Sequence, residues 1–182
     1  MLVLAAGRAR RFGSDKRQAR LANGETVLQA TLARVRAAGL EPRLVLAPGD
    51  PLLSEPGALV APGCAKGMGS SIADAVAQLQ EGVAGCLILP ADMPFVAPES
   101  IRAVAAALAD HAIVVPVFEG KRGHPVGFTA ALFAELQALQ GDIGARRIVA
   151  RQAARVLEVA VQDPGILWDI DTPADLSRQP PP

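Results

Sequence analysis

The sequence has few aromatic residues, no net charge and no long apolar run. Its 182 residues include five Phe, one Trp and no Tyr, and 18 basic residues balance 18 acidic ones. Nucleic-acid binders usually carry a basic face with aromatic side chains that stack on bases, so this composition argues against that class. The first apolar run, Met1–Ala6, is too short for a signal peptide, and no run reaches membrane-spanning length. We therefore expect a cytoplasmic protein with no membrane or nucleic-acid partner.

Cysteine is also scarce, and its spacing excludes two kinds of site. Cys64 and Cys86 form no C-x-x-C motif and have no neighbouring His, which argues against a zinc site and a disulfide framework. We expect two buried or half-buried reduced thiols. The length suits one hydrophobic core, so residues 1–182 are predicted to form a single domain.

Short apolar runs alternate with helical periods along the whole chain. The predicted strands are Leu2–Ala5, Leu44–Ala47, Cys86–Leu89 and Ile113–Val117. Apolar residues at helical spacing predict helices over residues 28–35, 72–79, 101–108 and 132–139, with Thr26 as an N-cap and Pro98 at a first helical position. Apolar strands separated by single helices indicate an α/β protein with a mostly parallel sheet. Ligands bind such sheets beyond the carboxyl ends of the strands, here after Ala5, Leu89 and Val117.

The segment after the first strand is strongly basic. A small-residue turn, Ala5–Gly7, leads into six cations and the single acid Asp15; the cations are Arg8, Arg10, Arg11, Lys16, Arg17 and Arg20. A P-loop is excluded because Lys16 is not followed by Ser or Thr, and a dinucleotide motif because position 9 is Ala. Small residues let backbone N–H groups approach an anion that the cations neutralise, so this pattern favours a triphosphate ligand.

Acidic residues stand where a metal ion could join that anion. Asp92 follows the strand Cys86–Leu89, and Asp169 and Asp171 alternate in "DID", which points both side chains to one face of an extended segment. Carboxylates from two segments would hold Mg²⁺ together with phosphate and water. The alternatives are an ordinary turn at Asp92 and, at Asp171-Thr172-Pro173, the start of the last short helix, with Thr172 as its N-cap.

Six segments resemble one known family in order and from end to end. "LAAGRARRFGSDK" is similar to the signature L-A-A-G-x-S-x-R-[FM]-G-x-x-K of nucleotidyltransferases of the MobA-like group, which includes molybdenum cofactor guanylyl- and cytidylyltransferases. The other similar segments are "GMGSSIADAV", "CLILPADMPFV", "GKRGHPVGF", "GDIGARRIV" and "WDIDTPADL". Two differences stand out: Ala9 replaces the common Ser, and Arg17, Gln18, Ala19 and Arg20 replace the usual apolar continuation after Lys16.

The resemblance implies a fold, an activity and a set of site residues. The fold is a three-layer α/β/α, Rossmann-like (glycosyltransferase-A-like) nucleotidyltransferase fold with a mostly parallel mixed sheet, and the cofactor is Mg²⁺. The implied catalytic residues are Lys16, Arg11 and Asp92, and the metal ligands are Asp92, Asp169 and Asp171. The implied nucleotide-binding residues are Leu4, Ala5, Ala6, Gly7, Arg8, Gly13, Lys16, Gly67, Ser70 and Ser71, and the acceptor-binding residues are Arg122, Gly123, His124 and Arg146.

The run Leu4-Ala5-Ala6-Gly7 resembles the cytidylyl branch, because the guanylyl branch usually has L-A-G-G. The resemblance therefore implies CTP as the nucleotide, a molybdopterin-type acceptor and a molybdenum hydroxylase apo-enzyme as a further partner. A sugar phosphate or another anionic acceptor stays open, as does a non-catalytic carrier of the molybdenum cofactor. An NAD-dependent oxidoreductase is disfavoured, because no G-x-G-x-x-G follows the first strand.

Overall fold

The computed structural model of the protein describes residues 1–7, 12, 13 and 15–177, and its centre is one eight-stranded sheet. The strands are β1 (Leu2–Leu4), β2 (Arg43–Leu46), β3 (Leu59–Val60), β4 (Gly85–Pro90), β5 (Ile113–Phe118), β6 (Lys121–Arg122), β7 (Val126–Thr129) and β8 (Val156–Ala160). Their order is β3-β2-β1-β4-β7-β5-β6, with β8 also paired to β5. β6 and β7 are antiparallel to their neighbours, and the other pairings are parallel, so the sheet is mixed but mostly parallel.

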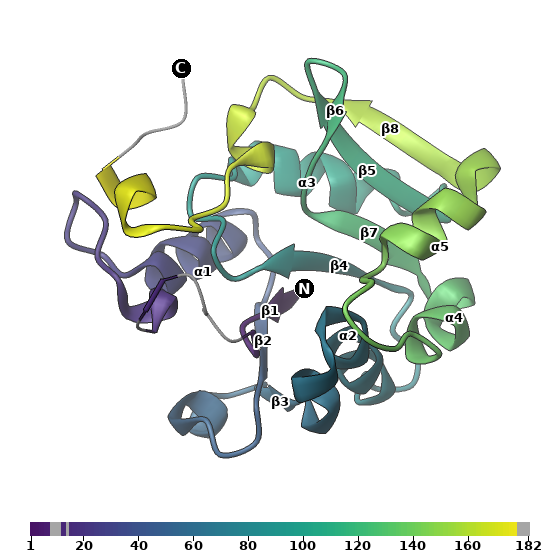
Figure 1. The fold of residues 1–182 in the computed structure, drawn as a ribbon. Coiled ribbons are helices and arrows are strands. Elements are labelled where there is room, and N and C mark those ends of the chain that lie inside the picture. The colour runs from purple at the N-terminus through teal and green to yellow at the C-terminus, as the bar shows by residue number, and fades with distance from the viewer. Residues whose placement is uncertain (8–11, 14, 178–182) are drawn as a thin grey trace.

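Helices cover both faces of the sheet (Figure 1). They are α1 (Val27–Ala37), α2 (Met68–Ala77), α3 (Pro98–Ala107), α4 (Phe133–Gln137) and α5 (Arg146–Arg151). In Figure 1, α2, α4 and α5 lie in front of the sheet, whereas α1 and α3 lie behind it. Within the described residues every helix is too short or too polar to cross a membrane.

The alternation of apolar side chains along the strands fixes these layers. In β4, Ile88 packs with α2, α4 and α5 in one buried cluster, and its neighbour Leu89 packs with α1 and α3 in another. β1 divides in the same way, because successive side chains of a strand point to opposite faces. Both faces are therefore buried, which explains why these strands are apolar throughout.

Local sequence signals set the helix boundaries. Thr26 accepts a hydrogen bond from Gln29 N, and the Gln29 side chain accepts one from Thr26 N, which forms a capping box at the start of α1. α3 begins at Pro98, and Asp163, from a distant segment, accepts hydrogen bonds from Ala97 N and Ser100 Oγ at its first turn. The predicted cap at Thr26 and the predicted start at Pro98 are confirmed.

Several elements differ from the prediction. The four predicted strands are present, but β3, β6, β7 and β8 and the helix α5 were not predicted. The helix predicted over residues 132–139 is a 3₁₀ turn, Ala130–Leu132, followed by the short helix α4. Cys64 is half-buried and Cys86 buried, and both are free thiols, as expected. Burial raises the pKa of Cys86 to about 12, so this thiol stays protonated and unreactive.

Candidate functional site

The carboxyl ends of β1 and β4 lie side by side and open into a cavity. Leu4 pairs with Pro90 in the sheet, and Ala91 N donates a hydrogen bond to Leu4 O at 3.0 Å. A cavity of about 420 Å³ opens beyond this edge. It is lined by Leu4, Ala5, Ala6, Gly7, Asp15, Lys16, Arg17, Val27, Ala47, Asp50, Ala91 and Asp92. The small-residue turn predicted to approach an anion therefore forms one wall of a hollow large enough for a small ligand.

Asp92 lies just beyond the end of β4 on a firmly held backbone. Thr31 of α1 is buried, and its hydroxyl donates to Ala91 O at 3.0 Å. Ile170 N donates to Asp92 O at 2.9 Å, so hydrogen bonds hold the chain before and at Asp92. The carboxylate Oδ2 accepts a hydrogen bond from Lys16 Nζ at 2.5 Å. The other oxygen, Oδ1, is buried and has no hydrogen-bond partner among the described residues, which leaves an acceptor ready for a ligand.

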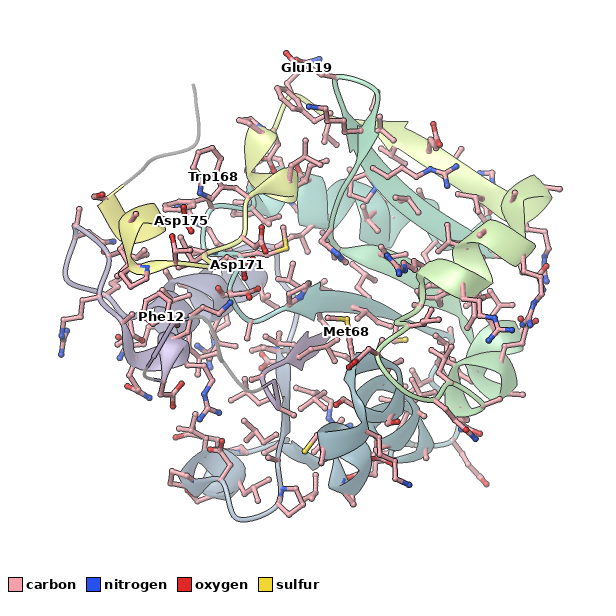
Figure 2. All side chains as sticks on the ribbon, in the orientation of Figure 1. Phe12, Met68, Glu119, Trp168, Asp171 and Asp175 are labelled. Atoms are coloured by element: carbon pink, nitrogen blue, oxygen red, sulfur yellow. The ribbon has the colours of Figure 1, made fainter. Side chains whose placement is uncertain are left out.

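The C-terminal segment brings two more carboxylates to Asp92. Ile170 is fully buried, so the extended chain turns Asp169 and Asp171 away from the core and toward the site. Lys16 Nζ lies 3.5 Å from Asp171 Oδ1, and Figure 2 shows Asp171 beside the C-terminal end of β4. Each of the three carboxylates offers an oxygen within 4.8 Å of the others.

This acidic group fits a hard cation. Burial raises the pKa of Asp169, and the neighbouring charges of Asp92 and Asp171 raise it further. Carboxylates that crowd together in this way are stabilised by a positive charge between them, and oxygen ligands are those that Mg²⁺ and Mn²⁺ take. Together with the buried Oδ1 of Asp92, the three residues could hold a divalent metal ion. The capping alternative also holds in part, because Asp175 accepts hydrogen bonds from Asp171 N and Thr172 N.

Lys16 and Arg17 occupy the first turn after the basic segment. They belong to the 3₁₀ helix η1 (Lys16–Gln18), whose N-cap Asp15 accepts a hydrogen bond from Arg17 N. The Lys16 side chain points to Asp92, whereas the Arg17 guanidinium pairs with Asp15 and with Asp50 from the loop after β2. The two adjacent cations therefore have different surroundings: one faces the acidic group and the other is enclosed by protein.

A second cavity of about 470 Å³ lies on the other side of the same strand ends. Leu4 lines both cavities, and Pro90 lines the second while Ala91 and Asp92 line the first. The four residues implied to bind an acceptor all line this second cavity; they are Arg122, Gly123, His124 and Arg146. Its remaining walls are mostly apolar and come from β4, β5, β7, α2 and α5, for example Ile72, Ile88, Val115, Val126 and Val149.

The polar groups of the second cavity are few and distinct. Burial lowers the pKa of His124, although a hydrogen bond at the Ile88 backbone and the charge of Asp92 oppose this shift. The His124 Nδ1 atom is buried and lacks a hydrogen-bond partner within the described part of the chain. Arg122 is exposed and its Nε donates to Glu158 Oε1 at 2.6 Å. A Cβ at Gly123 would collide with the Ile166 carbonyl, so only glycine fits there.

The serines implied to contact a nucleoside are engaged within the protein. Ser70 and Ser71 are buried in the first turns of α2. Ser70 Oγ accepts a hydrogen bond from Gly141 N at 3.1 Å, and Ser71 Oγ donates to Gly67 O at 3.4 Å. Gly67 itself has a φ of 125°, and a Cβ there would collide with Asp142. These residues anchor α2 to the loop at Gly141.

Three further predicted residues remain to be placed. Arg8 and Arg11 fall outside the described residues. Gly13 is exposed, with a φ of 76°, and is not among the residues that line the first cavity. The neighbouring Phe12 packs against the cluster around Ile170, as does Trp168 from the opposite side of the C-terminal segment in Figure 2.

Sequence reasoning missed Asp50 and Thr31. Asp50 follows a predicted strand, so the rule that sites form at the carboxyl ends of parallel strands could have found it. Thr31 reads as an ordinary helix residue, and no sequence signal marks its hydrogen bond to Ala91, 60 positions away.

Comparisons with known proteins agree with this fold. The family model for the MobA-like NTP transferase domain matches residues 1–156. Purine catabolism protein PucB of Bacillus subtilis (strain 168) is 32% identical over 192 residues, which cover 96% of this chain and 92% of that protein. The crystal structure of Rv0371c from Mycobacterium tuberculosis H37Rv has a TM-score of 0.81 at 30% identity and covers 96% of this chain and 92% of that one. A structure of Rv0371c in complex with manganese has a TM-score of 0.74 at 29% identity, over 88% of this chain and 86% of that one.

The fold and these relatives define a nucleotidyltransferase. More narrowly, the chain belongs to the MobA-like NTP transferase family.

Proposed function

We propose that the protein transfers CMP from CTP to the phosphate of a molybdopterin-type acceptor and releases pyrophosphate, with Mg²⁺ as the metal ion. One observation carries the proposal: Asp92, hydrogen-bonded to Lys16, lines the first cavity at the ends of β1 and β4, and Leu4 and Pro90 of the same strand ends line the second. A donor in one cavity and an acceptor in the other would meet beside the acidic group.

The first cavity is the proposed nucleotide site. Ala5, Ala6 and Gly7 would bring their backbone N–H groups to the triphosphate, with Lys16 on its other side. Gly67, Ser70 and Ser71 do not line this cavity, and the hydroxyls of both serines are engaged within the protein. The segment from Gly67 would therefore contact the nucleoside beyond the cavity, through its backbone. The other proposed contacts are Leu4, Arg8 and Gly13.

The proposed chemistry depends on position and charge. An ionised phosphate oxygen of the acceptor attacks the α-phosphorus, the new P–O bond forms, and the bond to pyrophosphate breaks. Such a nucleophile needs no general base, and Lys16, with Arg11, would neutralise the departing pyrophosphate. The metal ligands are Asp92, Asp169 and Asp171, which fit an oxygen-preferring ion. Mg²⁺ held there would supply Lewis-acid stabilisation of the charge on the phosphates.

The second cavity supports a molybdopterin-type acceptor over a sugar phosphate. A sugar carries a hydroxyl on most of its carbons, and burial of these against apolar side chains without hydrogen-bond partners is unfavourable. A flat pterin ring would cover the apolar wall and place ring N–H or amino groups near His124 Nδ1. Arg122 and Arg146 at this cavity would bind the anionic part of the acceptor.

CTP is proposed from the run Leu4-Ala5-Ala6-Gly7, which is similar to the cytidylyl branch of the family. The side chains of Ala5 and Ala6 are buried against the strand ends, so a small change here alters the shape of the cavity wall. The nucleotidylated product would serve a molybdenum hydroxylase apo-enzyme.

The test is a pyrophosphate-release screen with Mg²⁺ and each of CTP, GTP, ATP and UTP. Each nucleotide is paired with molybdenum cofactor or with a sugar phosphate. We expect turnover with CTP and the cofactor, loss of turnover in Asp92→Asn, and ordinary turnover in Asp110→Asn, an exposed carboxylate outside both cavities. Turnover with a sugar phosphate would contradict the acceptor, and turnover with another nucleotide would contradict CTP. Delivery of a cofactor without any turnover would instead support a carrier.

A further inference from the structure

Arg17 joins three segments of the chain at one edge of the first cavity. Its Nη1 donates to Asp50 Oδ2 at 2.5 Å and to Ala5 O at 3.3 Å. Its Nε and Nη2 donate to Asp15 at 2.9 and 2.8 Å. Each nitrogen of the guanidinium group therefore already contacts an oxygen atom of the protein.

This arrangement is largely enclosed, and its two carboxylates outnumber its one cation. The Arg17 side chain is 20% exposed and that of Asp50 only 8%. Two carboxylates face one guanidinium, in the fork geometry that makes Arg–carboxylate contacts strong and well oriented. A phosphate that approached Arg17 would have to displace these carboxylates and meet their negative charge.

The groups held by Arg17 are those that would meet the nucleotide. Ala5 begins the small-residue turn Ala5–Gly7 at the wall of the cavity. Asp15 is the N-cap of η1, whose first residue is Lys16. Asp50 is itself fixed after β2, because its Oδ1 accepts a hydrogen bond from Leu52 N at 3.0 Å. Arg17 thus links the turn Ala5–Gly7 and Lys16 to Asp50, which is itself held in the loop after β2.

We propose that Arg17 is a positioning residue that, through Asp50, aligns the turn Ala5–Gly7 and Lys16, and that it is not a phosphate ligand. For its effect on nucleotide binding, this inference rests on the proposed function. It distinguishes Lys16, which would face the ligand, from the adjacent Arg17, which organises the site.

The variant Asp50→Asn gives opposite results for the two roles. If Arg17 positions the site, a weaker partner lowers the affinity for metal-bound CTP. The loss should be about three- to tenfold, because Asn can still accept a hydrogen bond and only the difference between a charged and a neutral one is lost. If Arg17 were a phosphate ligand, the same variant would release its guanidinium and strengthen the affinity. Equal or stronger binding by Asp50→Asn overturns the inference.

Arg17→Met and Arg20→Met form a matched pair. Both remove one positive charge from the same segment, but Arg20 is exposed and donates only to Gly24 O among the hydrogen bonds of the described residues. We expect Arg17→Met to lower kcat/KM by about 100-fold, since misplaced groups lose catalysis steeply. Arg20→Met should stay within about twofold of the wild type. Arg17→Lys should recover only part of the loss, because an ammonium cannot contact both carboxylates as a fork. Equal losses in the two Met variants would overturn the inference in favour of bulk charge.

Hydrogen exchange of the ligand-free protein tests the positioning without any nucleotide. Arg17→Met should speed exchange of backbone amides over residues 5–7 and 15–18, whereas Arg20→Met should leave them unchanged. Unchanged exchange in Arg17→Met overturns the inference, whether or not CTP binds. If the wild type binds no nucleotide but exchange changes as expected, the proposed function fails and the positioning role stands. Thermal unfolding checks that each variant is folded. If Arg17→Met does not fold, Asp50→Asn replaces it in the same exchange measurement, with the same expected and contradicting results.

Discussion

Lys16 holds its ammonium beside the carboxylates that could bind a metal ion, and its removal should therefore separate metal binding from nucleotide binding. The Nζ atom lies 2.5 Å from Asp92 Oδ2 and 3.5 Å from Asp171 Oδ1, with the Lys16 side chain 15% exposed. A metal ion bound alone at Asp92 Oδ1 would meet the repulsion of this ammonium, and one that also takes Oδ2 or Asp171 Oδ1 would have to displace it. The variant Lys16→Met removes the competitor and leaves the carboxylates in place.

The size of the effect follows from the interaction that the metal has to break. A hydrogen bond between charged groups contributes about 1.5–3 kcal/mol, and 1.4 kcal/mol is a factor of ten in affinity. Lys16→Met should therefore bind Mn²⁺ alone about 10- to 100-fold more tightly than the wild type. With CTP present the order should reverse, because the variant lacks the cation that faces the triphosphate.

Electron paramagnetic resonance of free Mn²⁺, with and without CTP, measures both affinities. Lys121→Met is a suitable control, since Lys121 is exposed on β6 and lines neither cavity. If Lys16→Met binds Mn²⁺ alone no more tightly than the wild type, the ammonium does not compete with the metal and the reasoning is refuted.

Three further predictions concern stability. Asp163→Ala should lower the free energy of unfolding, measured in urea, by about 3 kcal/mol, because Ala97 N, Ser100 Oγ and Gly165 N lose a charged acceptor. A decrease below about 0.5 kcal/mol would contradict this. The pKa of His124 is lowered in the folded protein, so below about pH 6.5 the unfolded chain binds more protons than the folded one. Acid should therefore lower the melting temperatures of the wild type and of His111→Gln more than that of His124→Gln. The raised pKa of Asp169 means that its stabilising contribution is present at low pH and is lost as pH rises through the folded value. Asp169→Asn should accordingly be slightly more stable than the wild type at neutral pH, by less than about 1 kcal/mol, with the difference vanishing in acid; equal melting curves at neutral pH would oppose this.

Sequence patterns predicted the parts of the fold that depend on local periodicity. Apolar runs found β1, β2, β4 and β5, and the capping residue Thr26 marked the start of α1. β7 was missed because its Gly127 and the preceding Pro125 are typical of a loop, and β6 because its two residues are exposed and charged. Strand pairing across the sheet supplies the stabilisation of these segments, and a local pattern does not contain it.

The candidate site shows the same division. The alternation in "DID" predicted that Asp169 and Asp171 share a face, because the period of an extended chain is local. The pairing of Arg17 with Asp50 could not be predicted, since it depends on two loops that meet only in the folded chain. The segment after Lys16, which differs from the family's usual apolar continuation, carries this pairing.

The contacts of Lys16 connect residues separated by 76 and 155 positions. Contacts of such long range close late in folding, because the loop-closure entropy has to be overcome first. The candidate site is therefore among the last features that the chain completes, and partly folded forms would lack it. Any activity measured in a preparation of this protein would then come from its fully folded molecules alone.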